Sequence, residues 1–191
     1  MSIVVAVKKN GRIVMAADTL SSFGEAEMSP TANSRTDKIY RFGSSILGST
    51  GWAVYDDILS HYVSRHEMPD LTTKTAIFSF FMQFWKDLHE SYPFVNDQAI
   101  NKESPFGDLD SSFLFANANG IFKVSSDMCV SPFNQYYTIG SGSEYALGAL
   151  YNLYDALDDP AEIARYAVRT ACQFDVHCGG EIDVLEVEQP T

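Results

Sequence analysis

Hydrophobic positions at the start of the chain predict a strand that begins almost at the first residue. Residues 2–9 are rich in Val and Ile and alternate weakly, and residues 12–18 repeat this pattern. Asn10 and Gly11 separate the two segments, and this pair favours a type I′ turn because both residues tolerate positive φ. The first 18 residues therefore predict a β-hairpin.

A second hairpin and a pair of helices are predicted next. Residues 19–36 are polar and irregular, which predicts a loop or a short excursion, and residues 38–42 and 45–50 then follow as two strands. A helix is expected from Trp52 to about Arg65, and Asp70 is expected to cap another. Apolar residues recur there at steps of three and four and predict one buried stripe, which consists of Ile77, Phe78, Phe81, Phe84, Trp85 and Leu88. Residues 93–109 predict a loop.

The second half of the chain repeats this alternation of hairpin and helix pair. Residues 111–124 predict a third hairpin that turns at Asn119-Gly120, and residues 136–141 predict a short strand. Helices are expected over 143–156 and after Asp159, which acts as the cap with Pro160 in the first turn. The second of these helices has a small-residue face suited to close packing, made of Ala164, Ala167, Val168 and Ala171. A last strand is expected within residues 181–188.

The order of the elements indicates the fold class. Strands come in hairpins and helices come in pairs, so the doubly wound parallel sheet, in which strand and helix alternate, is excluded. Two antiparallel sheets covered by helix pairs fit the order. We therefore expect an α+β fold, a four-layer α-β-β-α sandwich, formed by one domain over residues 1–191.

Charge and cysteine content narrow the functional classes. The net charge of −12 repels phosphate backbones and anionic lipid, so neither nucleic acid nor a membrane is an expected partner. Three cysteines, at 129, 172 and 178, do not suggest a disulfide framework, and they show no zinc spacing with the four His. No signal peptide is recognisable before the first strand. We expect a cytoplasmic protein.

Several short segments could carry chemistry, although each has an ordinary structural explanation. Ser2 could simply be a small residue at the start of a strand, Asp18 a turn cap and Lys38 a solvated side chain. The segments GSTG (48–51) and GSGS (140–143) could be tight turns, and DVHCGG (175–180) could be a helix end with its Gly stop.

Taken together and in this order, these segments resemble the proteasome-type β-subunits of the N-terminal nucleophile hydrolases, a group that includes the bacterial HslV peptidases. The resemblance spans nearly the whole chain and is strongest in SIVVAVKKNGRIVMAADTLSSFG. TDKIYRF, GSTGWAVYD and IGSGSEYALGAL also match family segments. DVHCGG is closer to the Asp-x-x-Ser-Gly-Gly of proteasomal subunits than to the HslV segment.

This resemblance implies a catalytic arrangement. Removal of Met1 would leave Ser2 as the nucleophile with its own α-amine as base, and a free α-amine has a pKa near 8. Lys38 would be the buried cation beside Ser2, paired with Asp18. The N–H of Gly51 would stabilise the oxyanion. The remaining candidates, Ser141, Asp175 and Cys178, would lie around the terminal amine.

Three residues depart from the family pattern. Ser2 replaces the usual Thr and lacks the methyl group that helps to fix the rotamer, which predicts slower rather than absent catalysis. Cys178 stands where a Ser hydroxyl is usual, and a thiol is the weaker hydrogen-bonding group. Trp52 follows the expected oxyanion Gly and would narrow the site.

The expected activity is that of a self-compartmentalising endopeptidase that acts on peptides or unfolded proteins. The resemblance implies self-association into two stacked rings of six or seven subunits and an ATP-dependent unfoldase partner, although the chain has no nucleotide-binding GxxxxGK[ST] loop. No cofactor is required, and a structural monovalent or divalent cation is implied by resemblance alone. Two alternatives stay open: an amidohydrolase or transpeptidase on the same scaffold, and a ring-forming homologue without activity.

Overall fold

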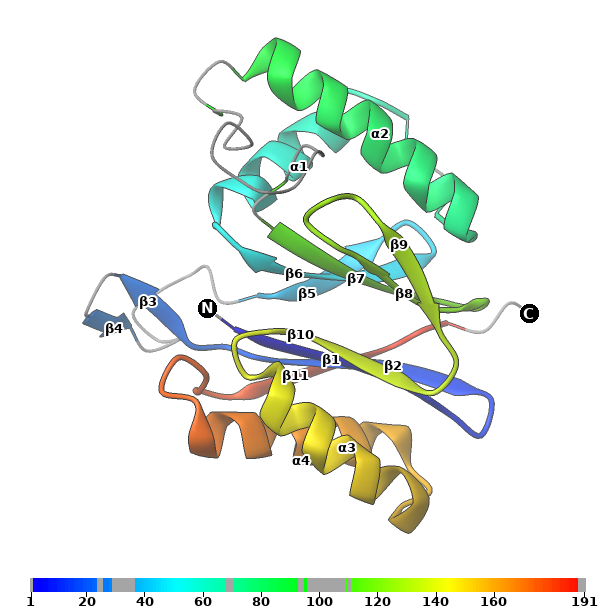
Figure 1. Ribbon diagram of the computed structural model, residues 1–191, viewed down its shortest axis with the longest axis vertical. Coiled ribbons are helices and arrows are strands. Elements are labelled where there is room, and N and C mark those ends of the chain that lie inside the picture. Colours follow the sequence, from blue (N-terminus) through cyan, green and yellow to red (C-terminus); the bar gives the residue numbers. More distant parts are fainter. Residues whose placement is uncertain are drawn as a thin grey trace.

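The chain forms a four-layer sandwich in which two antiparallel sheets lie face to face. The computed structural model describes residues 2–23, 26–28, 37–67, 71–92, 95, 109 and 111–188. In this part of the chain a pair of helices covers the outer face of each sheet (Figure 1). The α-β-β-α arrangement expected from the order of hairpins and helix pairs is confirmed.

The first sheet has the strand order β10-β1-β2-β11 and carries both chain ends. Its strands are β1 (Ile3–Lys9), β2 (Arg12–Asp18), β10 (Tyr136–Gly140) and β11 (Ile182–Glu186). Asn10 and Gly11 join β1 to β2 with φ of 52° and 77°, so the predicted type I′ turn is confirmed. Helices α3 (Ser143–Ala156) and α4 (Pro160–Phe174) cover this sheet, and the small-residue face of α4 is fully buried, as predicted.

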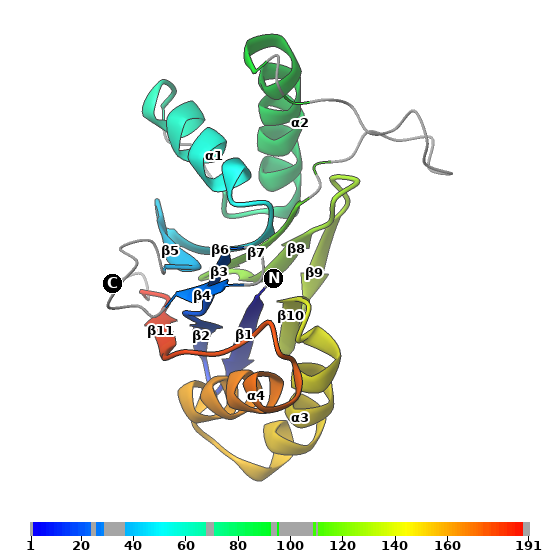
Figure 2. The ribbon, with the colours of Figure 1, turned by 90° about the vertical axis from the view of Figure 1, so that its left-hand side faces the viewer.

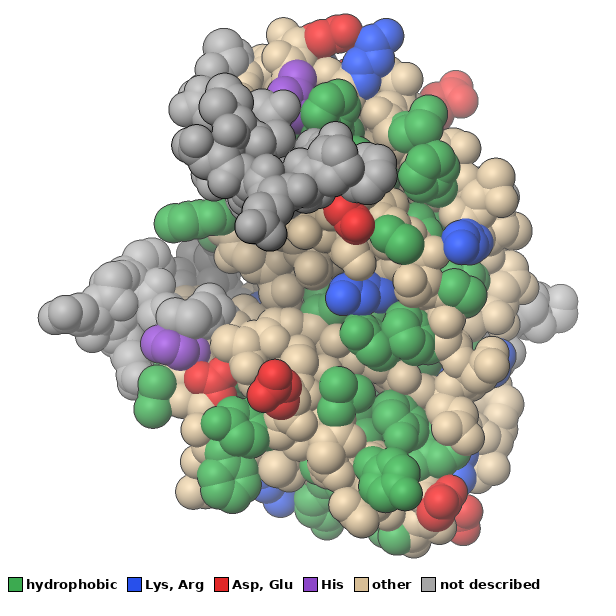
Figure 3. Space-filling view, viewed as in Figure 1, with side chains coloured by type: hydrophobic (Ala, Val, Ile, Leu, Met, Phe, Trp, Pro, Cys, Tyr) green, Lys and Arg blue, Asp and Glu red, His purple; other side chains and the backbone are tan. Residues whose placement is uncertain are grey.

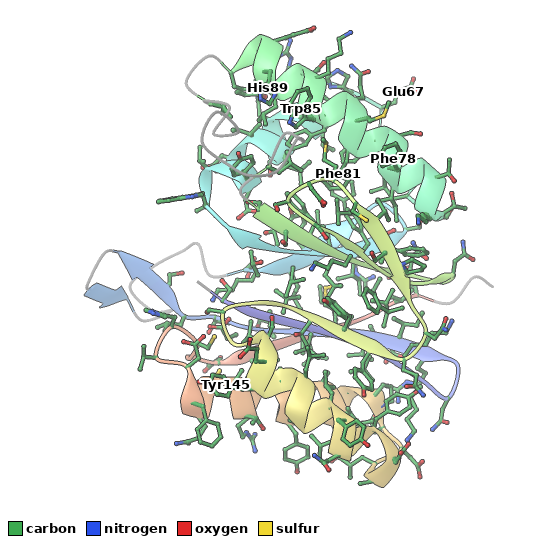
Figure 4. All side chains as sticks on the ribbon, viewed as in Figure 1. Glu67, Phe78, Phe81, Trp85, His89 and Tyr145 are labelled. Carbon is green, nitrogen blue, oxygen red and sulfur yellow. The ribbon has the colours of Figure 1, made fainter. Side chains whose placement is uncertain are left out.

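The second sheet has the order β5-β6-β7-β8-β9. Its strands are β5 (Ile39–Phe42), β6 (Ser45–Gly51), β7 (Ser111–Asn117), β8 (Gly120–Val124) and β9 (Val130–Phe133). Helices α1 (Val54–Ser64) and α2 (Lys74–Ser91) pack on it through a core rich in aromatic rings. Phe81 points from α2 to the sheet, where its ring contacts Phe113 and Phe115 of β7 (Figure 4).

Aliphatic side chains fill the space between the two sheets, and Gly48 marks a close approach. A Cβ added to Gly48 of β6 would lie 2.5 Å from Val4 Cγ1 of β1 and 3.1 Å from Met15 Sδ of β2. A Cβ essentially never lies as close as 2.5 Å to another heavy atom, so the absence of a side chain at Gly48 lets β6 approach β1 this closely.

Five sequence predictions need correction. Residues 19–36 contain two short paired strands, β3 (Ser21–Phe23) and β4 (Ala26–Met28), while Gly24 and Pro30 lie outside the described residues. β9 was not predicted, because Pro132 lowers its β-propensity; such a residue is tolerated at the edge of a sheet. The third hairpin turns one residue earlier than predicted, since Asn117 pairs with Gly120. The predicted stripe on α2 is buried except at Phe78, which is 43% exposed, and Trp85, which is partly buried.

The fifth correction concerns the start of α2. Thr73 caps this helix by accepting a hydrogen bond from the Ala76 N–H at 3.2 Å, whereas Asp70 was predicted as the cap and lies outside the described residues. By contrast, Asp159 caps α4 as predicted, through the Ala161 N–H. Both caps use a short polar side chain with extended backbone.

Charged and hydrophobic side chains are interspersed on the face drawn in Figure 3, and hydrophobic groups gather over the α3 side of the molecule. Tyr145 of α3 and Phe174 at the end of α4 are both exposed, and their rings lie 5.7 Å apart. In the described part of the chain, no helix is long and apolar enough to cross a membrane.

Candidate active site at the start of β1

Asp18, the last residue of β2, joins three distant segments through its completely buried side chain. Its Oδ1 accepts hydrogen bonds from the Ile3 N–H at 3.0 Å and from Lys38 Nζ at 2.8 Å. Its Oδ2 accepts the Gly179 N–H at 3.0 Å. A buried carboxylate is stable when it is paired and hydrogen-bonded in this way, so the ammonium group and the two N–H groups offset its desolvation.

Ser2 lies immediately before β1 and is 8% exposed. Figure 2 shows the N-terminal end between the two sheets, at the end of the molecule that faces the viewer. Lys38, which precedes β5, shares the acceptor atom of the Ile3 N–H, and its side chain is only 12% exposed. A nearly buried cation is therefore held beside the first residue of the strand.

Gly140 brings the end of β10 against the backbone of Ser2. It pairs with Ile3 in the antiparallel register and has φ of 108°, and a Cβ at this position would lie 2.0 Å from the Ser2 carbonyl oxygen. Only Gly fits such an approach. The turn that follows places Ser141 Oγ 3.5 Å from the same carbonyl, as a long hydrogen-bond donor.

Asp175, Cys178 and Ser141 form a second polar group beside Ser2. Asp175 ends α4, and its carboxylate accepts the His177 N–H at 3.0 Å and the Cys178 thiol at 3.3 Å. Cys178 Sγ also lies 3.9 Å from Ser141 Oγ. Burial alone would raise the pKa of Asp175, but hydrogen bonds from Ser141, His177 and Cys178 bring the pKa below its ordinary value.

The environment of Cys178 keeps its sulfur protonated. Burial, the charge of Asp18 and the hydrogen bond to Asp175 raise the pKa of this thiol to about 12. Burial likewise raises the pKa of Cys172 to about 11. A reactive cysteine needs a low pKa, so both side chains are unsuited to act as nucleophiles at neutral pH, and Cys178 serves as a hydrogen-bond donor.

Gly51 ends β6 with φ of 135°, in the left-handed range that favours glycine. The preceding residue reaches the site, because the Cβ position of Gly140 lies 3.2 Å from Thr50 Cγ2. Trp52 is 70% exposed and therefore projects from the surface next to Gly51.

The structure thus collects Ser2, Asp18 and Lys38 with Ser141, Asp175 and Cys178, although these residues are far apart in the sequence. Gly51 stands at the end of β6, in the other sheet. The sequence reasoning missed the contacts of Thr19, Gly140 and Gly179. Glycine at positions 140 and 179 was visible within the motifs, but only the fold shows which backbone each approaches. Nothing in the pattern distinguished Thr19.

The described residues contain no group of three or more His, Cys, Asp or Glu side chains that could hold a metal ion. The structural cation expected from family resemblance therefore has no support from side-chain ligands in this part of the chain. All three cysteines are free thiols.

Comparisons with known proteins extend over almost the entire chain. The chain is 32% identical to Thiobacillus denitrificans BPH, with a TM-score of 0.88 over 98% of this chain and 100% of that one. A second structure of that protein is in complex with epoxomicin and has a TM-score of 0.87. The ATP-dependent protease subunit HslV of Hyphomonas neptunium is 28% identical over 97% of this chain and 91% of its own length.

Two further comparisons delimit this similarity. The HslV of Trypanosoma brucei has a TM-score of 0.69 over 98% of this chain and 99% of that one, and its 20% identity supports the fold alone. No family model matches the chain.

Proposed function

Since the chain belongs to the proteasome β-subunit-like N-terminal nucleophile hydrolases, we propose that it is an endopeptidase whose nucleophile is the hydroxyl of Ser2. The HslV relatives support a proteasome-like peptidase as the activity. Met1 lies outside the described residues, and its removal would turn the Ser2 amide nitrogen into a free amine. That amine is the general base of the proposed reaction.

The observation that carries this proposal is that the Ile3 N–H and the Lys38 ammonium group donate hydrogen bonds to the same oxygen atom of Asp18. Asp18 Oδ1 binds the first N–H of β1 and the Lys38 ammonium at once, so a nearly buried cation stands one residue from Ser2. A cation beside a hydroxyl favours the alkoxide that forms as the proton leaves. Asp18 holds this cation in place but does not itself contact the substrate.

The proposed reaction is acyl transfer. The Ser2 hydroxyl attacks the peptide carbonyl while its proton passes to the α-amine of the same residue, so base and nucleophile need little positioning entropy. The Gly51 N–H donates to the oxyanion, and the protonated amine then gives its proton to the leaving amine. An ester on Ser2 remains. Water then attacks this ester while the α-amine takes its proton and passes it to Ser2 Oγ, which restores the hydroxyl and releases the acyl group as a carboxylic acid.

The second polar group supports the base. Ser141 touches the Ser2 carbonyl, and Asp175 and Cys178 form a hydrogen-bonded chain with Ser141. We propose that these three residues orient the terminal amine, with Asp175 ionised near neutral pH because its pKa is lowered. An anion close to an amine favours the protonated amine that forms during attack.

The relatives also support a proposed assembly. Their name describes an ATP-dependent protease subunit, so we propose that this chain associates with copies of itself into two stacked rings of six or seven subunits. An ATP-dependent unfoldase is the proposed partner, and peptides or unfolded proteins are the proposed substrates. Light scattering of the purified protein measures the assembly directly, and a monomer would contradict it.

The experiment that tests the mechanism combines mass and activity. Untagged protein from its native host is measured by intact mass and N-terminal sequencing, and a panel of fluorogenic peptides is assayed. We expect a chain that begins at Ser2, with hydrolysis that Ser2→Ala abolishes. Ser60→Ala removes an exposed hydroxyl from α1 and serves as the matched control with wild-type activity.

Other outcomes would favour the alternatives. Retention of Met1 in the native host, with no hydrolysis, would refute the Ser2 mechanism and leave a ring-forming homologue without activity. Cleavage of small amides without any protein degradation would indicate an amidohydrolase or transpeptidase. Epoxomicin, found in complex with the Thiobacillus relative, gives an independent probe. We expect it to inhibit hydrolysis by the wild-type protein and to bind Ser2→Ala far more weakly.

A further inference from the structure

The loop between α4 and β11 folds back on the end of β2, where Thr19 holds it. This loop lies at the same end of the molecule as the N-terminus and β3 (Figure 1). Thr19 is 4% exposed. Its Oγ1 accepts the Glu181 N–H at 2.8 Å and donates to the Glu181 carbonyl at 3.2 Å, so one hydroxyl satisfies both backbone groups of one loop residue.

The backbone of the same strand end completes this attachment. The Thr19 N–H donates to the carbonyls of Gly179 and Glu181, at 3.2 and 3.1 Å, and the Leu20 N–H donates to Gly179 at 2.9 Å. Gly180 has φ of 76°, and a Cβ there would lie 2.6 Å from Thr19 Oγ1. The loop is therefore shaped closely around this hydroxyl.

The position of this loop matters because its residues Cys178 and Gly179 form hydrogen bonds with side chains of the candidate site. The Gly179 N–H donates to Asp18 Oδ2, opposite the oxygen that holds Lys38. The preceding residue, Cys178, contacts Asp175 and Ser141. A shift of the loop would move one hydrogen-bond donor away from Asp18 and would move the Cys178 thiol as well.

We propose that Thr19 is a positioning residue for the reaction at Ser2. Its hydroxyl fixes residues 179–181 so that the Gly179 N–H fills the second oxygen of Asp18 and the carboxylate keeps the Lys38 ammonium in place. This inference rests on the proposed function. Its structural half, that the hydroxyl orders the loop, does not depend on activity.

Thr19→Val tests the inference because Val has nearly the shape of Thr and lacks only the hydroxyl. A misplacement of about 1 Å can cost as much as 100-fold in rate, so we expect kcat to fall about 10-fold with KM nearly unchanged. Amide hydrogen exchange of residues 179–181 should become faster. Thr19→Ser keeps the hydroxyl and should restore most of kcat and of the protection.

Thr170→Val is the matched control. It removes a hydroxyl that donates to the Tyr166 carbonyl on the surface of α4, at 2.9 Å, and should leave kcat and the exchange of the loop unchanged. If kcat of Thr19→Val equals that of an active wild-type protein, the inference is overturned while the proposed function stands. If the wild-type protein hydrolyses no peptide, the proposed function fails. In that case amide hydrogen exchange still tests whether the Thr19 hydroxyl orders residues 179–181. Equal exchange rates of these residues in Thr19→Val and in the wild-type protein would refute that statement.

Discussion

Replacement of Asp18 by Asn tests the electrostatic centre of the candidate site. The substitution preserves shape but removes the negative charge that faces the Lys38 ammonium at 2.8 Å. One end of the Asn amide can still accept the Ile3 N–H. The other end carries hydrogen atoms and would face the Gly179 N–H, where Asp18 Oδ2 now accepts at 3.0 Å.

The expected cost follows from these contacts. Leaving one member of a buried ion pair unpaired costs roughly 3–5 kcal/mol, and an unsatisfied buried N–H costs about 1–3 kcal/mol. The two terms overlap, and the 12% exposure of the Lys38 side chain gives its ammonium some contact with water. We therefore expect Asp18→Asn to lower the free energy of unfolding by about 3–5 kcal/mol. This leaves a folded protein only if the wild-type stability lies well within the usual range of roughly 5–15 kcal/mol.

The assay is urea unfolding at one fixed protein concentration, since association contributes to apparent stability. Lys38→Met and the double variant Asp18→Asn/Lys38→Met complete a double-mutant cycle. Removing the unpaired cation should make the double variant about 1–2 kcal/mol more stable than the sum of the two single effects. Peptide hydrolysis should stay absent in it. A loss below about 1 kcal/mol in Asp18→Asn, or strict additivity in the cycle, would refute this account of the site.

Three further predictions use matched or titratable positions. Gly140→Ala would place a Cβ 2.0 Å from the Ser2 carbonyl oxygen, so it should abolish peptide hydrolysis and lower the midpoint of thermal unfolding. Gly148→Ala is the matched control, because its Cβ would enter open space on helix α3. It should raise the free energy of unfolding by about 0.5–1 kcal/mol in the same melting assay. Cys178→Ala removes a hydrogen bond that lowers the pKa of Asp175, so the Asp175 carboxyl should titrate at a higher pH when it is followed by NMR; an unmoved titration contradicts that coupling. The ionised Asp175 carboxylate should stabilise the fold at pH values above its unfolded pKa of 3.8. This stabilisation should disappear as the pH falls through the lowered pKa of the folded state. Unfolding curves of Asp175→Asn and of the wild-type protein between pH 2 and 6 would measure it.

Local features of the sequence predicted most elements. Asn10-Gly11 defined the first hairpin because both positions need positive φ, and the structure has 52° and 77° there. The helix predicted over residues 143–156 has those bounds, and Asp159 caps the next helix. Periodicity failed at Phe78, since a helical stripe indicates a direction but not how far the neighbouring sheet extends.

In the candidate site, too, the sequence predicted some features and left others undetermined. Family motifs indicated all seven candidate residues, and the ion pair of Lys38 with Asp18 is present. Their roles in catalysis stay predictions. No local pattern revealed that Gly140 reaches the Ser2 carbonyl, or that Thr19 bonds to Glu181, because each contact joins residues more than 130 positions apart.

The sequence by itself determined most of the strands and helices and the cap of α4, because the φ preference of a residue and the period of a hydrophobic face are local properties. Only the tertiary structure decided which strands pair with each other and which strand ends therefore lie together at the candidate site. Antiparallel pairing of β1 with β10 sets Ile3 opposite Gly140, and pairing of β2 with β11 sets Asp18 opposite Ile182. These two registers bring the turn at Ser141 and the loop at Gly179 to the first residue of β1. Strand neighbours are chosen by burial of whole faces, a non-local property that no single segment encodes.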